Sequence, residues 1–285
     1  MKSGTTSLYE YLCSHPEISR CNLRKQVNFY SDDELWSRGI EWYQDQWSYD
    51  PSLHRWALEA SPAYTEPHNA EKCAKRMASV NAEFQLIYLV RDPFERIRSH
   101  FYHYKQRGIF PEELSLSQAL RTRPSLVEVS RYYQWVAAYD RFFTRDNVFL
   151  LTLEALAEHP DKCLSDICRF LEIDDQFAFP NDNKRYNSRK VQRWHGSFVH
   201  SLRSIQLLRR LVRSLLPLDV RNRLKGLFAK GPSPETGYPE LMEKDRRYIR
   251  EQLTEDLNEL RQDARVSIDH WSIYRAGEST ESSSI

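Results

Sequence analysis

Two short stretches of the chain are almost wholly apolar and too short to form a buried helix. Residues 84–90 read FQLIYLV, and residues 148–152 read VFLLT. Runs of this length without regular polar alternation are typical of strands that are buried on both faces of a sheet. A third segment, WALEA at residues 56–60, also has the character of a short strand and runs into a Ser-Pro turn.

Elsewhere the apolar positions recur at helical spacing. We expect helices at residues 5–14, 33–47, 66–80, 94–106, 132–144 and 160–171, and a last helix that ends near residue 262. Strands that alternate with helices predict an α/β fold, here a P-loop-like, three-layer fold with a central, mostly parallel sheet and helices on both faces. We expect one domain over residues 1–274 and a disordered, serine-rich tail over residues 275–285.

The composition narrows the classes of protein that fit this fold. The chain has 285 residues, with 41 Lys+Arg against 40 Asp+Glu, and this balance gives no reason to expect a nucleic-acid partner. No apolar run approaches the about 20 residues that span a bilayer, and no signal-peptide pattern opens the chain. The five cysteines are odd in number and lack CxxC spacing, which disfavours a metal site or a disulfide framework. We therefore expect a soluble, cytoplasmic protein without a bound metal.

The segment KSGTT, Lys2 to Thr6, precedes the first expected helix and has the ingredients of an anion-binding loop. Gly4 allows a close backbone approach, Thr5 and Thr6 supply hydroxyls, and the first helical amides and the Lys2 ammonium attract negative charge. The lysine precedes the glycine, unlike in the GxxxxGK[ST] loop of common ATP- and GTP-binding proteins. A plain helix N-terminus with a conventional cap explains so short a motif equally well.

A second candidate lies where the strand at residues 84–90 ends. Arg91 follows this strand directly, and Ser99 lies two turns along the next helix. Ligands of open α/β sheets bind at the carboxyl edge of the strands, so the guanidinium and hydroxyl are suited to a second phosphate. The alternative is a local Arg91–Asp92 ion pair followed by Pro93 as the first residue of a helix.

Taken together, KSGTTSL and YLVRDPFERIRSHFYHY closely resemble the two signature segments of the sulfotransferases that use 3′-phosphoadenosine 5′-phosphosulfate (PAPS). The resemblance continues in order through HPEI, RKQVNFYS, EASPAY and the C-terminal SIDHW, and it is strongest to the bacterial and glycosaminoglycan-type branch. It implies transfer of a sulfuryl group from PAPS to a hydroxyl or amine of a carbohydrate, a lipid or another small molecule, without a metal.

The resemblance also implies roles for particular residues. Lys2 would neutralise charge on the bridging oxygen of PAPS while the phosphosulfate bond breaks. The 3′-phosphate would be held by Arg91 and Ser99. The 5′-phosphate would be held by Ser3, Gly4, Thr5, Thr6 and Ser7. Positive charge and preorganised N–H donors are what such an anionic leaving group requires.

Four basic residues fall where the family often has a loop that closes over the nucleotide. The alternative for such a run is a solvated surface. The four residues are Lys184, Arg185, Arg189 and Lys190, of which Arg189 and Lys190 are our candidates for nucleotide binding. The basic stretch at residues 203–225 either covers the acceptor cleft, touches an anionic surface or packs its leucines on the core.

The sequence departs from the family at the general base. Many relatives have a glutamate after the lysine of their KExxFF-like segment, and here that position is Gln26, whose amide cannot accept a proton at neutral pH. Glu59 is the best nearby substitute, although a salt bridge to an arginine is an equal explanation of that residue. His103 is a further catalytic candidate, with aromatic packing as its alternative. An amine acceptor, or one that brings its own base, would also suffice.

The second departure concerns the phosphate-binding loop. In relatives an apolar strand leads into this loop, whereas here only Met1 precedes Lys2. We expect a first strand that is truncated because the start was placed too late, and weak or absent PAPS binding if the start is correct, because a loop at a frayed terminus pays ordering entropy on binding.

Two other functions remain open from the sequence. A non-catalytic protein that binds PAPS or its desulfated product PAP is favoured by Gln26 and by the truncated strand. A P-loop nucleotide kinase requires a lysine after the glycine and an acidic magnesium site at a strand end, and we find neither.

Overall fold

The computed structural model describes residues 2–23, 25–180, 194–195, 229–230 and 239–274. Its longest strands, β3 (Leu86–Val90) and β4 (Val148–Thr152), pair in parallel over all five residues. A second parallel pair consists of β1 (Ile18–Arg20) and β2 (Trp56–Leu58). The two-residue strands β5 (Trp194–His195) and β6 (Ala229–Lys230) pair antiparallel.

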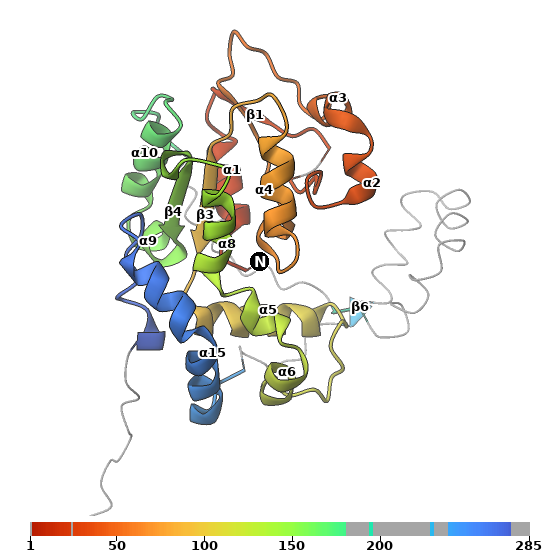
Figure 1. The fold of residues 1–285 in the computed structure, drawn as a ribbon, viewed down its shortest axis with the longest axis vertical. Helices are drawn as coiled ribbons and strands as arrows, with labels where there is room; N and C mark the ends of the chain where they lie inside the picture. Colours follow the sequence, from red (N-terminus) through yellow and green to blue (C-terminus); the bar gives the residue numbers. More distant parts are fainter. Residues whose placement is uncertain (1, 24, 181–193, 196–228, 231–238, 275–285) are drawn as a thin grey trace, which may run out of the picture.

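The helices surround these strands (Figure 1). The α-helices are α1 (Thr5–Leu12), α2 (Asp33–Trp36), α3 (Gly39–Gln44), α4 (Ala70–Ala78), α5 (Pro93–Gln106), α6 (Leu116–Thr122), α7 (Ser125–Glu128), α8 (Tyr132–Asp140), α9 (Leu153–Glu158), α10 (Pro160–Phe170) and α15 (Glu243–Gln262). Short 3-10 turns are η1 (Pro62–Thr65), η2 (Arg145–Asn147) and η3 (Ser272–Tyr274).

Side chains of β3 alternate between two hydrophobic cores. Tyr88 and Val90 belong to a core that includes residues of α5, α6, α7, α8 and α15. Ile87 and Leu89 belong to a second core, with residues of α1, α9 and α10. Because successive side chains of a strand point to opposite faces, the sheet is covered on both sides. This confirms the α/β fold with strands buried on both faces.

The third core packs aromatic side chains beside the central strands. Phe29 and Tyr30 are buried there, and the Tyr43 ring stacks on Phe29 at 4.4 Å between centroids. This core joins α2, α3 and α4 to the end of α8. It therefore anchors the RKQVNFYS segment to the rest of the domain.

The expected helix at residues 33–47 is wrong as one element, because the structure divides it into α2 and α3. Asp32 caps the start of α2 by accepting from the amides of Glu34 and Leu35. Gly39 begins α3 with φ of 84°, a left-handed conformation that interrupts a continuous helix. The apolar residues keep their helical spacing across Gly39, so hydrophobic periodicity alone did not reveal the break.

Other boundaries differ for local reasons. The helix expected at residues 66–80 begins only at Ala70, after η1. Helix α9 follows β4 without a loop because the Thr152 hydroxyl accepts from the Ala155 amide at 3.1 Å and caps it. Strand β1 has three residues and is recognisable only through its pairing with β2. Helices α6 and α7 were not predicted either.

The described strands form separate two-stranded sheets rather than the single central sheet that we expected. Within the described ranges no strand pairs β2 with β3, so the two parallel pairs remain unjoined. The expected tail at residues 275–285 and the basic stretch at residues 203–225 lie outside the described residues. None of the helices in the described part of the chain is both long enough and apolar enough to span a bilayer.

Candidate functional site

The opening loop turns sharply into α1. Gly4 precedes the helix with φ of 86°, and its carbonyl accepts from the Ser7 amide at 3.0 Å. As the first residues of the helix, Thr5 and Thr6 have no intrahelical acceptor for their backbone N–H groups. Ser3 is buried beside them. The loop therefore presents helix-start amides and hydroxyls, which together favour an anion.

Gly4 also lies against the end of β4. A Cβ placed on Gly4 would stand 2.5 Å from the Cδ1 atom of Leu153, the first residue of α9. The positive φ therefore favours glycine, and a side chain at this position would also have to displace the end of Leu153. A side chain at position 4 would occupy the space between the loop and Leu153.

A lysine that we did not predict completes the loop. The Lys25 ammonium donates to the Thr5 hydroxyl at 3.0 Å and to the Thr6 hydroxyl at 3.1 Å. Burial lowers the pKa of Lys25 to about 8, against the opposing attraction of Glu10. The signal that could have identified it is the lysine of the RKQVNFYS segment itself, which we used only to locate Gln26. Gln26 is exposed, next to Lys25 in the chain.

Glu59 does not make the arginine salt bridge that was its alternative explanation. Its carboxylate instead accepts hydrogen bonds from two backbone amides and three hydroxyls. The donors are Val27 N (2.8 Å), Asn28 N (2.9 Å), Tyr43 Oη (2.6 Å), Tyr64 Oη (2.7 Å) and Ser61 Oγ. These bonds fix the residues that follow Lys25, so Glu59 positions the segment that supplies the lysine.

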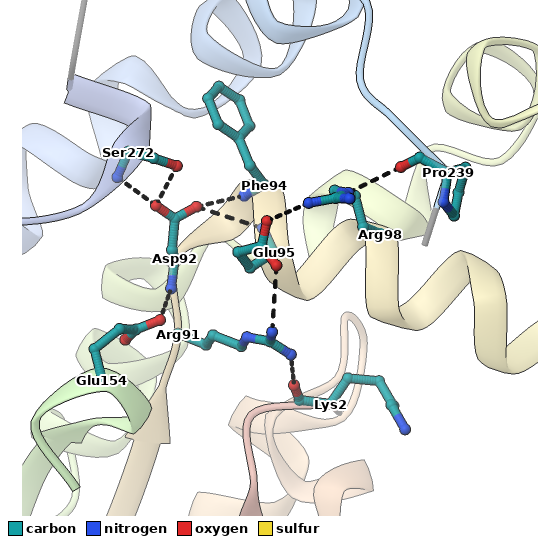
Figure 2. A network of polar contacts seen from close by, with 9 residues as sticks. All are labelled: Lys2, Arg91, Asp92, Phe94, Glu95, Arg98, Glu154, Pro239 and Ser272. Carbon is teal, nitrogen blue, oxygen red and sulfur yellow. Dashed lines mark hydrogen bonds and ion pairs between the residues drawn. The ribbon is translucent and has the colours of Figure 1, made fainter. Parts of the chain in front are cut away.

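Arg91 connects the second motif to the first (Figure 2). Its Nη1 donates to the carbonyl oxygen of Lys2 at 3.3 Å, and its Nη2 lies 3.5 Å from a carboxylate oxygen of Glu95. The ion pair is therefore with Glu95, and the expected alternative of an Arg91–Asp92 pair is wrong. Two segments almost ninety residues apart in sequence meet at this contact.

Asp92 instead organises the start of α5. One carboxylate oxygen accepts from the amides of Phe94 and Glu95, and the other accepts from the Ser272 hydroxyl at 2.7 Å (Figure 2). The Asp92 amide in turn donates to Glu154 at 3.1 Å. The backbone that carries Arg91 is thus held from the C-terminal segment and from α9.

Helix α5 carries the remaining candidates of this motif. Ser99 is buried on it, and His103 is partly buried one turn further along. Burial, together with the positive charges of Lys2 and Arg107, lowers the pKa of His103 to about 4. His103 is therefore neutral at pH 7. Arg189, Lys190, Lys184 and Arg185 lie outside the described residues.

The comparisons with known proteins agree with these motifs. The sulfotransferase domain family matches residues 1–192, and the chain belongs to this family. The membrane-associated sulfotransferase kil1 of Dictyostelium discoideum is 33% identical over 135 residues, which cover 45% of this chain and 27% of that protein. The bifunctional heparan sulfate N-deacetylase/N-sulfotransferase 4 of Mus musculus is 24% identical over 200 residues, covering 62% of this chain and 22% of that protein.

The matched part of the chain thus spans about a quarter of the length of these curated relatives. The crystal structure of a sulfotransferase from Alicyclobacillus acidocaldarius superposes with a TM-score of 0.55 at 19% identity, over 89% of this chain and 92% of that chain. This likeness supports the same overall fold.

Gly4→Ala should destabilise the protein more than Gly39→Ala does. Both glycines have positive φ, which costs an alanine about 1 kcal/mol. Only at Gly4 does the added Cβ meet a neighbour, the flexible end of the Leu153 side chain, whose displacement from its rotamer adds about 0.5–1.5 kcal/mol, whereas at Gly39 nothing lies within 4 Å. Denaturant unfolding of the purified variants measures both losses.

In a Leu153→Ala background the two glycine substitutions should cost the same, because the clashing methyl group is gone. Equal losses in the wild-type background would contradict the close contact between Gly4 and Leu153.

Proposed function

We propose that this protein is a PAPS-dependent sulfotransferase, which transfers a sulfuryl group from PAPS to a hydroxyl or amine of an acceptor. The observation that carries the proposal is that two distant segments meet at the opening loop. Lys25 reaches the Thr5 and Thr6 hydroxyls, while Arg91 reaches the Lys2 carbonyl. An anion with two phosphate groups fits such a set of separate cationic and N–H donor groups.

In the proposed reaction the sulfur–oxygen bond to the 5′-phosphate breaks and sulfur bonds to the acceptor oxygen or nitrogen, whose proton passes to a base. PAP is released. The loop from Ser3 to Ser7 would hold the 5′-phosphate, with Lys2 and Lys25 offsetting the charge that develops on the bridging oxygen. Arg91 and Ser99 would hold the 3′-phosphate.

Fixed donors favour this role because they are already oriented before the nucleotide binds. The Gly4 turn, the cap at Asp92 and the bonds to Glu59 hold the three segments without a ligand. Little reorganisation is then required as charge develops in the transition state.

For the general base we favour His103 over Gln26 and Glu59. Gln26 has no basic atom. Glu59 already accepts from five donors, so its carboxylate serves the Lys25 segment. His103 is neutral at pH 7 and close enough to Lys2 for that charge to lower its pKa. A neutral imidazole has a lone pair available for the acceptor proton, and the lowered pKa makes it a weaker base than an unperturbed histidine.

A carbohydrate is the acceptor class that we place first, ahead of lipids and other small molecules. The support is the similarity to proteins named heparan sulfate N-deacetylase/N-sulfotransferases. A second function, binding of PAPS or PAP without turnover, is favoured by the exposed amide of Gln26 where relatives have a glutamate.

Arg91→Ala should weaken PAP binding by at least about tenfold, because charge-assisted hydrogen bonds contribute about 1.5–3 kcal/mol. Arg141→Ala is the matched control, since Arg141 makes only an exposed pair with Glu71. Calorimetric titration of PAP measures affinity, and transfer of labelled sulfate from PAPS to heparan-type oligosaccharides measures turnover.

Equal PAP affinity in the wild type and both variants would contradict the proposed nucleotide site. Tight PAP binding without transfer to any hydroxyl or amine acceptor would instead support the non-catalytic binder.

The PAP affinity should fall as pH rises from 7.5 to 9.5. In the free protein the Lys25 pKa is lowered to about 8, so the ammonium deprotonates over this interval, while a bound anion favours its charged form. We expect a loss of about tenfold in the wild type and a flat profile in Lys25→Arg, because arginine stays charged. A wild-type affinity that does not change with pH would show that Lys25 does not face the nucleotide.

His103→Asn should slow sulfate transfer by about 10²-fold, the usual lower range for a general base, while PAP affinity changes less than about twofold. A second variant tests the proton transfer directly. Arg107→Ala removes a positive charge that lowers the His103 pKa, so the acid limb of the pH–rate profile should move to higher pH. An unmoved acid limb, or full turnover in His103→Asn, would rule out this base.

A further inference from the structure

Arg91, which we propose as a ligand of the 3′-phosphate, is paired with a carboxylate in the structure (Figure 2). Its Nη2 atom lies 3.5 Å from a carboxylate oxygen of Glu95, and its Nη1 atom donates to the Lys2 carbonyl. A two-pronged contact between a phosphate and a guanidinium uses at least one of the two Nη atoms. A phosphate that binds Arg91 must therefore compete with a group that Arg91 already contacts.

Glu95 also lies on the side of α5 where the phosphate is expected. Ser99, the other proposed ligand of the 3′-phosphate, follows Glu95 by four residues in this helix. Residues at this spacing project from the same face of a helix, one turn apart. The Glu95 charge therefore lies close to the proposed phosphate position and repels a 3′-phosphate there.

A second arginine provides Glu95 with another partner. The other carboxylate oxygen of Glu95 accepts from Arg98 Nη1 at 2.6 Å, the shorter of its two arginine contacts. Arg98 is held in turn, because its Nε donates to the Pro239 carbonyl at 2.8 Å (Figure 2). Glu95 can thus leave Arg91 and keep a cationic partner, which avoids the cost of an uncompensated, partly buried charge.

The neighbouring carboxylate, Asp92, is not available for this exchange. It accepts from the amides of Phe94 and Glu95 at the start of α5 and from the Ser272 hydroxyl. A change of partner at Arg91 therefore concerns the Glu95 side chain and leaves the helix cap in place.

We propose that Glu95 is an exchangeable counter-ion, which limits how tightly nucleotides with a 3′-phosphate bind. When the 3′-phosphate of PAPS or PAP contacts Arg91, the Glu95 carboxylate gives up Arg91 and keeps Arg98. When PAP leaves, Glu95 pairs with Arg91 again, and this contact favours release of the product. The inference rests on the proposed function, because it requires a 3′-phosphate at Arg91.

The first test is Glu95→Gln in the full 285-residue chain. Because the competing charge is gone, PAP should bind about threefold to tenfold more tightly and dissociate more slowly by a similar factor. Adenosine 5′-monophosphate (AMP) lacks the 3′-phosphate, so its affinity should not change. Glu71→Gln is the matched control, since it removes the same charge from an exposed pair with Arg141. Calorimetric titration measures the affinities, and stopped-flow displacement measures PAP dissociation.

Arg98→Gln should have the opposite effect on PAP. Without Arg98, Glu95 pairs with Arg91 alone, so PAP should bind about threefold more weakly. In the double variant Glu95→Gln/Arg98→Gln this loss should disappear, because the carboxylate that Arg98 draws from Arg91 is absent. A merely structural role of Arg98 would weaken binding in both backgrounds.

The outcomes separate this inference from the function on which it rests. If the wild type binds PAP but Glu95→Gln binds it no more tightly, or tightens AMP equally, or leaves the dissociation rate unchanged, the exchange is overturned and the nucleotide site stands. A loss with Arg98→Gln that persists in the double variant also overturns the exchange. A wild type that does not bind PAP would overturn the proposed function and this inference together.

Discussion

The close approach of the opening loop to the carboxyl end of the central strands is the constraint on which the candidate site depends. Gly4 stands where any Cβ would collide with Leu153, and Arg91 holds the Lys2 carbonyl. These contacts hold the start of α1 against the carboxyl end of the central strands. A helix N-terminus in open solvent attracts anions weakly, whereas one fixed against two strand ends presents its donors in a defined direction.

Behind this contact lies a network that joins distant parts of the chain. Asp92 caps α5 and accepts from Ser272, while Glu154 accepts from the Asp92 amide and from the Trp271 indole. Trp271 is almost fully buried, so the C-terminal SIDHW segment is part of the core that supports the site. Because Asp92 is occupied in this way, the Arg91 guanidinium remains directed at the loop and at Glu95.

Glu59 illustrates how a chemically suggestive residue acquires its role from its surroundings. In sequence it was the nearest carboxylate to the missing glutamate of the family, and so a natural choice for a base. In the fold it accepts from two amides and three hydroxyls, including those of Tyr43 and Tyr64. A carboxylate that satisfies five donors has few lone pairs left for a substrate proton, and it acts by holding the Lys25 segment.

The sequence by itself predicted the α/β class and the buried strands at residues 84–90 and 148–152, which the structure has at 86–90 and 148–152, because apolar runs are local signals. It also located two candidate phosphate-binding motifs, whose role stays a prediction. It did not reveal the break at Gly39, the role of Lys25 or the partners of Glu59 and Asp92. Each of these depends on backbone conformation or on side chains far away in the chain. Only the tertiary structure could decide them, since hydrogen bonds and close contacts follow from distances in space that residue spacing does not encode.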